Sequence, residues 1–286
     1  MAAVNILEDR EALAQWVAEN RRAGRSVGFV PTMGALHAGH VSLFQTARQE
    51  CDRVIGSIFV NPTQFGPNED FQRYPRTLEA DRILLEGAGC DALFLPAVDL
   101  IYPPGHQTVV RVGAVAEGLC GACRPGHFQG VATVVAILFN RVAPQRAYFG
   151  LKDYQQFLVI RQMVRDLGLA VAVVGLPTVR EADGLAMSSR NRYLTPADRH
   201  QSLALYRAMT AAQAVYADGQ RDPTRLEETA REVLTGAGID RIDYVAVRDR
   251  ETLAPLTRIE TDPVLLLAVH VGVARLIDNR ILQSEL

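Results

Sequence analysis

Two histidines stand three residues apart in the stretch GFVPTMGALHAGH, residues 28–40. The stretch follows a short apolar run and leads into a helical pattern, so we expect His37 and His40 on the first turn of a helix. A helix N-terminus offers unpaired N–H groups and the positive end of the helix dipole, which favour an anion. Imidazoles add hydrogen-bond donors, and Gly34 and Gly39 let the backbone approach a bulky ligand. The stretch indicates a phosphate site, although by itself it also fits two surface histidines that cap a helix.

A metal site is the second interpretation of these histidines. Zinc-binding pairs on a helix commonly lie four residues apart, or come with a nearby Glu or Cys, and this stretch has neither feature. The segment CGAC brings Cys120 and Cys123 together, but a structural zinc site needs a second pair, which the sequence lacks. The segment also lies among Gly and Pro rather than after a strand, as a redox pair would. We therefore expect reduced thiols without a metal role.

Two further segments carry groups that bind phosphate. Met187–Arg190 (MSSR) combines two hydroxyls with a guanidinium, whose fork can hold phosphate oxygens in pairs. Lys152 and Asp153 (in GLKD) pair a compact positive charge with a residue that can cap a helix. Each segment alone also fits an ordinary turn or a solvated lysine. Together with the histidines, they indicate one phosphate site built from three parts of the chain.

The composition sets limits on the function. The chain has 286 residues, 48% of them hydrophobic and 22% charged, which is ordinary for a globular protein with a sizeable core. A net charge of −2 argues against a general nucleic-acid binder. No apolar run reaches the length of a membrane-spanning helix, and the first residues lack the pattern of a secretory signal. We expect a cytoplasmic protein that binds neither nucleic acid nor membrane.

The hydrophobic pattern predicts strands that alternate with helices. Apolar runs predict strands over 26–31, 54–60, 91–96, 146–150 and 170–175, with an edge strand over 108–113. Helical patterns cover 8–23, 39–51, 76–88, 128–143 and 153–167. The runs are apolar on both faces, which is typical of a mostly parallel sheet covered on both sides. Ligands bind such sheets at the carboxyl ends of the strands, and every phosphate motif follows a predicted strand.

The pattern changes after about residue 178. Two helices are expected over 196–218 and 222–236, followed by strands over 241–249, 263–271 and 273–282. The fold class expected is α/β, with a Rossmann-like, mostly parallel sheet domain over residues 1–178. A smaller α+β C-terminal domain over residues 179–286 is expected to close over the active site.

Six segments of the chain resemble known families. PTMGALHAGH resembles the H-x-G-H signature of the nucleotidylyltransferase superfamily, which is related to class I aminoacyl-tRNA synthetases, and MSSR resembles its mobile phosphate-binding loop. The segments FVNPTQFGPNEDFQRYPRT, RPGHFQGVATVV, YFGLKDYQQ and PTVREADGLAMSSRNRYL are similar to those of the pantoate–β-alanine ligase family. The matching segments span roughly residues 27–195. The chain is thereby identified as a member of that family.

The resemblance implies ATP-dependent synthesis of an amide in two steps. The carboxylate of (R)-pantoate attacks the α-phosphorus of ATP, which releases pyrophosphate and leaves pantoyl adenylate. The amine of β-alanine then attacks the activated acyl carbon to give pantothenate and AMP. A carboxylate reacts with an amine only once its oxygen has become a good leaving group, so both steps need positioning and charge stabilisation.

The resemblance also assigns residues to roles. His40 matches the proton donor of the family, and His37 would contact the phosphates with it. Lys152, Ser188, Ser189 and Arg190 would stabilise charge during adenylation. Gln64 and Gln156 would bind pantoate through neutral amides, with Gln64 also near β-alanine. ATP would contact Pro31, Thr32, Met33, Gly34, Ala35, Leu36, His37, Ala38, Gly39, His40, Gly150, Leu151, Lys152, Asp153, Val179, Met187, Ser188, Ser189 and Arg190.

Other implied features concern the metal and the assembly. Mg²⁺ is expected because it neutralises the leaving pyrophosphate, with Asp81 as a possible contributor. Asn61 and Arg124 are expected to assist the site. The family also implies a homodimer that acts on small molecules. One departure is Ile137, where the family pattern predicts a lysine.

Three competing functions were compared with this one. Another adenylyltransferase of the same superfamily would need basic residues where this chain has Gln64 and Gln156. A regulatory module that only binds nucleotide would not need His37, His40 and Lys152 together. A tRNA synthetase would need more than about 108 mildly charged residues for RNA recognition after the first domain.

Overall fold

The computed structural model describes residues 3–67 and 69–284, which form two sheets with their helices. The larger sheet is parallel and has the strand order β1-β4-β3-β2-β5-β6. Its strands are β1 (Asn5–Leu7), β2 (Val27–Thr32), β3 (Arg53–Ile58), β4 (Ala92–Phe94), β5 (Arg146–Gly150) and β6 (Ala172–Leu176). The order reverses between β2 and β5, where a crevice opens at the carboxyl ends of the strands.

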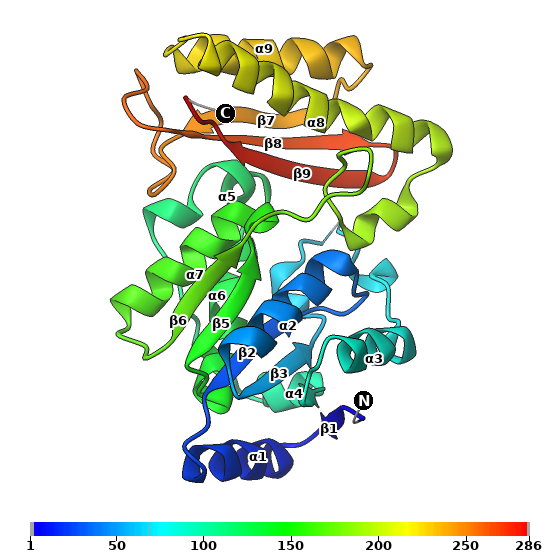
Figure 1. The fold of residues 1–286 in the computed structure, drawn as a ribbon, viewed down its shortest axis with the longest axis vertical. Coiled ribbons are helices and arrows are strands. Elements are labelled where there is room, and N and C mark those ends of the chain that lie inside the picture. Colours follow the sequence, from blue (N-terminus) through cyan, green and yellow to red (C-terminus); the bar gives the residue numbers. More distant parts are fainter. Residues whose placement is uncertain (1–2, 68, 285–286) are drawn as a thin grey trace.

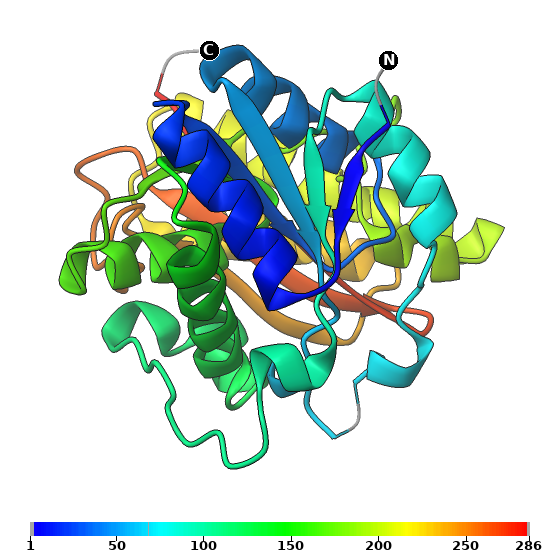
Figure 2. The ribbon, with the colours of Figure 1, turned by 90° about the horizontal axis from the view of Figure 1, so that it is seen from below.

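Helices cover both faces of this sheet (Figures 1 and 2). Neighbouring residues of a strand point to opposite faces, so Phe29 packs in the core against α1, α6 and α7, whereas Val30 packs in the core with α2 and α3. The helices of this half are α1 (Arg10–Arg22), α2 (Ala38–Glu50), α3 (Leu78–Gly87), α4 (Val98–Ile101), α5 (Leu119–Cys123), α6 (His127–Val142) and α7 (Tyr154–Asp166). Short 3₁₀ turns lie at η1 (Pro62–Gln64), η2 (Phe71–Arg73), η3 (Ala114–Ala116) and η4 (Leu151–Asp153).

The second sheet is antiparallel, with the order β7-β8-β9. It consists of β7 (Ile242–Arg248), β8 (Val264–Val271) and β9 (Ala274–Ile281), which follow η5 (Ser189–Tyr193), α8 (Pro196–Ala217) and α9 (Pro223–Gly236). One face of this sheet, with Val245 and Leu267, packs against α8 and α9. The other face, with Val264 and Leu266, joins the core of the parallel half. The two halves therefore share an apolar interface.

The α/β class and the order of elements are confirmed, with two corrections at one edge of the parallel sheet. The prediction of an edge strand over 108–113 was wrong, because this segment pairs with no strand. Its Val110 N–H is donated to the side chain of Thr133 in α6, at 2.9 Å, and Val109 is exposed. The edge position beside β4 belongs to β1, a strand that the sequence pattern did not indicate. In the described ranges, no helix is both long and apolar enough to cross a membrane.

Candidate active site

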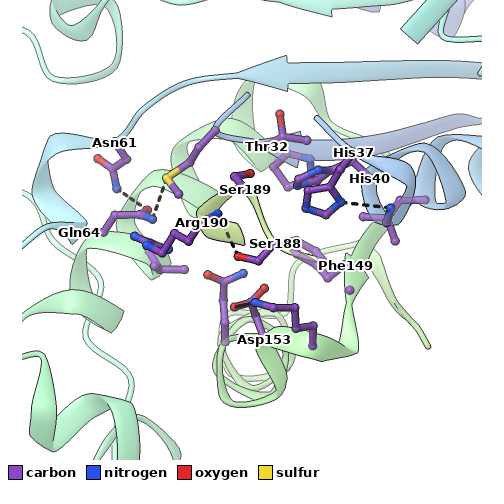
Figure 3. Close-up of a pocket in the computed structure, with 18 of the residues that line it drawn as sticks. Thr32, His37, His40, Asn61, Gln64, Phe149, Asp153, Ser188, Ser189 and Arg190 are labelled. Carbon is purple, nitrogen blue, oxygen red and sulfur yellow. Dashed lines mark hydrogen bonds and ion pairs between the residues drawn. The ribbon is translucent and has the colours of Figure 1, made fainter. Parts of the chain in front are cut away.

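A cavity lies at the carboxyl ends of β2 and β5, next to the point where the strand order reverses (Figure 3). His37 and His40 lie on one side of it, Asn61 and Gln64 lie on the other, and the turn η5 lies between them. The cavity has a volume of about 220 Å³. It adjoins a wider cavity of about 660 Å³ that extends along β9, and both share Arg124, Lys152, Asp153, Ser188 and Arg190.

The two histidines occupy the first turn of α2 with their ring centroids 4.2 Å apart. His37 is the N-cap, and its Nδ1 accepts the N–H of Gly39 at 3.2 Å. A neutral ring that accepts at Nδ1 carries its proton on Nε2, which makes Nε2 a donor. The Nδ1 of His40 is enclosed and has no hydrogen-bond partner among the described residues. An enclosed polar atom without a partner at this position is suited to meet a ligand.

Desolvation keeps both rings neutral. It lowers the pKa of His37 to about 4, with a smaller effect from the charge of Lys152. Desolvation, followed by the proximity of His37, lowers the pKa of His40 to about 3. Without ligand, the pair therefore offers hydrogen bonds without a positive charge at neutral pH. A bound polyanion would shift both rings toward the protonated form.

Asp81 fixes the loop that joins β2 to the histidines. Its carboxylate accepts the N–H groups of Ala35 at 2.9 Å and Leu36 at 2.8 Å, and it is 1% exposed. Ala35 has φ at +51°, a left-handed conformation that L-residues adopt only when their surroundings hold them in it. Thr77 donates a further hydrogen bond to the same carboxylate. The structure therefore gives Asp81 a role in shaping the loop.

The amide side of the cavity is organised around Gln64, which is 8% exposed. Asn61 donates its side-chain N–H to the Gln64 Oε1 at 3.1 Å. Within residues 3–67 and 69–284, the Gln64 Nε2 donates to the sulfur of Met33 alone. Because sulfur is a weak acceptor, this N–H can turn to a better one. The Gln64 carbonyl accepts from His127 at 2.9 Å and from Arg124 at 3.3 Å. Desolvation lowers the pKa of His127 to about 4.

The position of the amide side depends on a close approach of two backbones. A Cβ added to Gly130, in α6, would lie 2.5 Å from the carbonyl oxygen of Thr63. The Gly130 carbonyl also accepts a hydrogen bond from Asn61 at 3.2 Å. A larger residue at position 130 would push η1, and with it Gln64, away from the cavity.

The turn η4 places Lys152 at the junction of the two cavities. The turn follows the end of β5 and leads directly into α7. The Lys152 Nζ lies 3.8 Å from an oxygen of Asp153, and its side chain is 19% exposed. The chain contains 30 Lys and Arg residues, and Lys152 is its only lysine. Gln156, one turn further along, also lines the first cavity.

The segment Met187–Arg190 lies between the histidines and the amide side of the cavity (Figure 3). The Ser188 Oγ caps η5 by accepting the Arg190 N–H, and the Ser189 Oγ donates to the carbonyl of Ala35 at 3.0 Å. Asp70 accepts from the Arg190 Nε and Nη2 at 3.0 and 2.8 Å. The guanidinium also lies over the ring of Tyr74. Asp70 raises the pKa of Arg190 against the opposing effect of burial, so the guanidinium stays charged.

The structure brings most of the predicted site residues to one cavity. Its lining includes Pro31, Thr32, Met33, His37, Gly39, His40, Gln64, Gly150, Lys152, Asp153, Gln156, Val179 and the four residues of Met187–Arg190. The predicted residues outside this lining are Gly34, Ala35, Leu36, Ala38 and Leu151. Asn61 and Arg124 line the cavity as expected.

Sequence reasoning missed several residues of the site. Tyr74 and His127 line the cavity, and Asp70 holds Arg190 from outside it. Asp70 and Tyr74 lie within FVNPTQFGPNEDFQRYPRT, and His127 lies within RPGHFQGVATVV. These motifs carried the family resemblance, but nothing in their spacing indicates which of their side chains face the site.

The remaining predicted features lie outside the histidine cavity. Residues 3–67 and 69–284 contain no group of three His, Cys, Asp or Glu side chains that could hold a metal ion. Cys120 and Cys123 are not joined by a disulfide, and the Cys120 Sγ lies 3.1 Å from the hydroxyl of Tyr244. Ile137 packs partly buried against the core of the parallel half.

Comparisons with known proteins show similarity over nearly the whole chain. The family model described as pantoate-beta-alanine ligase matches residues 5–281. The pantothenate synthetase of Magnetococcus marinus is 57% identical over 98% of this chain and 96% of its own, and that of Moorella thermoacetica is 54% identical over 98% and 99%. The crystal structure of pantothenate synthetase from Thermus thermophilus has a TM-score of 0.91 at 50% identity, covering 98% and 99% of the two chains. A pantoate-beta-alanine ligase from Francisella tularensis, complexed with beta-gamma ATP and beta-alanine, has a TM-score of 0.81 at 35% identity and covers 98% of each chain.

Proposed function

Because this chain belongs to the pantoate–β-alanine ligase family, we propose that the cavity between β2, β5 and η5 is where its reaction takes place. The reaction is the ATP-dependent condensation of (R)-pantoate with β-alanine to pantothenate, through pantoyl adenylate, with release of AMP and pyrophosphate. The proposal concerns the residues that carry out each step. One observation carries it, namely that three separate phosphate-binding segments and two neutral amides face one cavity.

The first step forms a bond between a pantoate carboxylate oxygen and the α-phosphorus of ATP, and breaks the bond from that phosphorus to the β-phosphate. Negative charge moves onto the leaving pyrophosphate, so fixed donors around the phosphates lower the barrier. His37 and His40 donate ring N–H groups from one side. Lys152 adds a positive charge at the mouth of the cavity. Ser188, Ser189 and Arg190 donate from the segment between the histidines and the amide side.

Pantoate occupies the side of the cavity with the amides of Gln64 and Gln156. Its hydroxyls both donate and accept, and amides match them without adding charge. Asn61 fixes the orientation of Gln64 by donating to its Oε1, so the Nε2 is the group that turns from Met33 to the substrate. His127 and Arg124 hold the backbone of Gln64 in place.

The second step joins the β-alanine nitrogen to the acyl carbon and breaks the bond from that carbon to the AMP oxygen. The β-alanine amine approaches near Gln64 and loses a proton as the amide forms. Bound phosphates favour protonation of the nearby rings. His40 can then act as the proton donor to the leaving phosphate oxygen.

Mg²⁺ enters this scheme as part of the MgATP substrate. Among the described residues, no cluster of side chains could hold the ion, and the Asp81 carboxylate is occupied by backbone N–H groups. Mg²⁺ commonly binds substrate phosphates and keeps several waters, so it does not require a protein cage. We assign no residue of this chain to the metal.

The domain division and the assembly belong to the same proposal. We propose that residues 1–178 bind ATP and pantoate, and that residues 179–286 close over them. Contacts of Arg190 with Asp70 and of Ser189 with Ala35 support such a closure, since they join the two parts across the cavity. A homodimer in the cytoplasm is the proposed working form.

The assignment can be tested by separating the two half-reactions. Purified protein is incubated with ATP, Mg²⁺ and pantoate, with and without β-alanine, while pyrophosphate and AMP are measured. Early pyrophosphate in an amount limited by the enzyme is expected, with sustained AMP only after β-alanine is added. The variant Gln64→Ala tests the site, and Gln155→Ala is its control. Gln155 is a buried amide of the same helix as Gln156, but it holds the backbone around η3 and lines neither cavity.

The Gln155→Ala control separates an effect on pantoate binding from a general loss of stability. Gln64→Ala is expected to raise the pantoate KM far more than Gln155→Ala does at comparable stability. Equal effects of the two variants would contradict the assignment of Gln64. A well-folded wild-type protein that releases no pantoate-dependent pyrophosphate would contradict the site as a whole.

A further inference from the structure

Strand β9 belongs to the small sheet, yet two of its consecutive residues bind segments outside that sheet. Asp278 and Asn279 are 3% and 8% exposed, the only buried polar side chains that the described part of the small sheet contains. Figure 1 shows that β9 is the strand of this sheet nearest to the parallel half. Buried polar groups need partners, and both residues find theirs outside their own sheet.

Asn279 binds the turn that carries Lys152. Its Nδ2 donates to the carbonyl of Leu151 at 2.9 Å and to the carbonyl of Lys152 at 2.8 Å. An amide nitrogen has two hydrogens, so one side chain satisfies two consecutive carbonyls of η4. The turn has no ladder partner there, because β5 ends at Gly150 and α7 begins at Tyr154. Asn279 thus fixes the peptide planes on both sides of the Lys152 Cα.

Asp278 anchors the strand beside Asn279. Its two oxygens accept from the Arg180 Nη1 and Nη2 at 2.7 and 2.9 Å, a bidentate pair in which the Asp278 side chain is 1% exposed. The backbone N–H of Asn279 also donates to Asp278 at 2.8 Å. Arg180 forms a β-bridge with Ala186, immediately before Met187. β9 is therefore tied to two of the three segments that supply phosphate-binding groups, the Lys152 turn and the segment Met187–Arg190.

We propose that Asn279 is a positioning residue for Lys152 in the adenylation step. This inference rests on the proposed function, in which Lys152 binds the phosphates of ATP. Lysine is a flexible side chain with a compact charge, so the position of its Nζ depends on how firmly its backbone is held. A rigid Lys152 turn places that charge at the phosphates before ATP arrives. The small sheet thereby contributes to catalysis through a residue that does not touch the substrate.

The test compares Asn279→Ala with Gln213→Ala. Gln213 is also a buried amide, and it binds the backbone of Gln283 through two hydrogen bonds in the same half of the protein. It lines neither cavity. Both variants lose a buried amide with two backbone contacts, so they are expected to lose similar stability. Only Asn279→Ala is expected to change the chemistry.

Adenylation is measured as pantoate-dependent exchange of pyrophosphate into ATP, without β-alanine. Asn279→Ala is expected to lower kcat by roughly 10- to 100-fold and to raise the KM for ATP, because small misplacements of a binding group are costly in a transition state. The KM for pantoate is expected to stay close to that of the wild type. Asn279→Ser keeps one donor and should be intermediate, which provides a second variant if Asn279→Ala does not fold.

The only lysine gives a readout besides turnover. An acyl phosphate of ATP transfers its acyl group to an amine that lies at the phosphates, and peptide mass spectrometry reports the modified residue. Wild-type protein and Gln213→Ala are expected to be acylated at Lys152 at equal rates. Asn279→Ala is expected to react more slowly there at the same occupancy of the probe.

A double variant decides between positioning and general support. If Asn279 acts through Lys152, adding Asn279→Ala to Lys152→Ala is expected to cost little more than Lys152→Ala alone. Full additivity, or an Asn279→Ala variant equal to Gln213→Ala in exchange and acylation, would overturn the inference and leave the proposed function intact. Normal exchange in Lys152→Ala would overturn both, because Lys152 would then not bind the reacting phosphates.

Discussion

The two sides of the phosphate site are built in different ways. The histidine side is a continuous piece of chain, β2, a loop and the first turn of α2, and the Asp81 carboxylate accepts hydrogen bonds from two N–H groups of the loop. The other part is the segment Met187–Arg190, which has no long helix or strand of its own. It is held by Asp70 and by the carbonyl of Ala35, residues 120 and 154 positions away.

This difference separates a preformed part of the site from an assembled one. β2 and α2 adjoin the histidines directly in the chain, and Asp81 holds the loop between them. The guanidinium of Arg190 reaches its position only when two distant segments come together. We expect substitutions on the histidine side to remove chemistry, and substitutions on the other side to alter how well the site is assembled.

The largest effect is expected from His40→Ala, which removes a preformed donor. The kcat of pantoate-dependent exchange should fall by roughly 10²- to 10³-fold, the usual cost of losing a donor that stabilises transition-state charge. The control is His200→Ala, because His200 is an exposed histidine of α8. Activity within twofold of the control would show that the preformed side does not carry the chemistry.

Arg190→Lys is expected to have the next largest effect. Lysine keeps the charge but cannot form the paired hydrogen bonds with Asp70 or lie flat over Tyr74, so we expect a loss of roughly 10²-fold in exchange. Arg192→Lys, at an exposed position of the same turn, is the matched control. If Arg190→Lys retained normal exchange, charge alone would suffice, and the paired geometry would have no catalytic meaning.

Asp70→Asn is expected to act more weakly. The guanidinium remains, and its contact with Tyr74 and the Ser188 cap of η5 persist, so a loss of about tenfold is expected, mostly in the KM for ATP. Asp166→Asn, on an exposed turn of α7, is the control. Faster exchange in Asp70→Asn would contradict a positioning role for Asp70, because Asp70 would then compete with the phosphates for Arg190.

The last prediction concerns stability in acid rather than catalysis. The pKa values of His37, His40 and His127 lie at about 4, 3 and 4, below the ordinary value of 6.5. Below about pH 6.5 the unfolded chain binds protons that the folded chain does not, so stability is lost as the pH falls from there toward about 4. The loss is on the order of 1 kcal/mol per histidine for each pH unit.

Urea unfolding of the ligand-free protein at pH 7 and pH 5 measures this loss. His40→Asn should reduce the difference between the two pH values by its share, whereas His200→Asn should leave it unchanged. An identical difference in wild type and His40→Asn would show that His40 is not held neutral in the folded state.

The two parts of the site also differ in how well the sequence predicts them. Apolar runs between helical patterns predicted the parallel sheet, because its inner strands β2, β3 and β4 are buried on both faces. The histidine side followed because its motif is contiguous. No motif or spacing in the sequence around Asp70 or Asn279 marked either residue as part of the site. Their partners, Arg190 and Lys152, lie 120 and 127 positions away, and no spacing rule connects them. The unique lysine was visible in the composition and could have marked Lys152 directly.

Errors in the fold have the same origin. The segment 108–113 has the residue types of a strand, but its Val110 N–H goes to Thr133 and its neighbours stay exposed. β1 is only three residues long, too short to give a pattern, and its pairing with β4 depends on how the whole sheet assembles. Asp9, the N-cap of α1, separates β1 from the helix that was expected to begin at residue 8.

The most direct test of the site is a crystal structure with a non-hydrolysable ATP analogue and pantoate. We predict that the triphosphate binds between the rings of His37 and His40 and the segment Met187–Arg190, with Lys152 beside the phosphates. Pantoate is predicted at Gln64 and Gln156. A triphosphate bound in the wider cavity beside Arg241 and Arg275, away from the histidines, would contradict it.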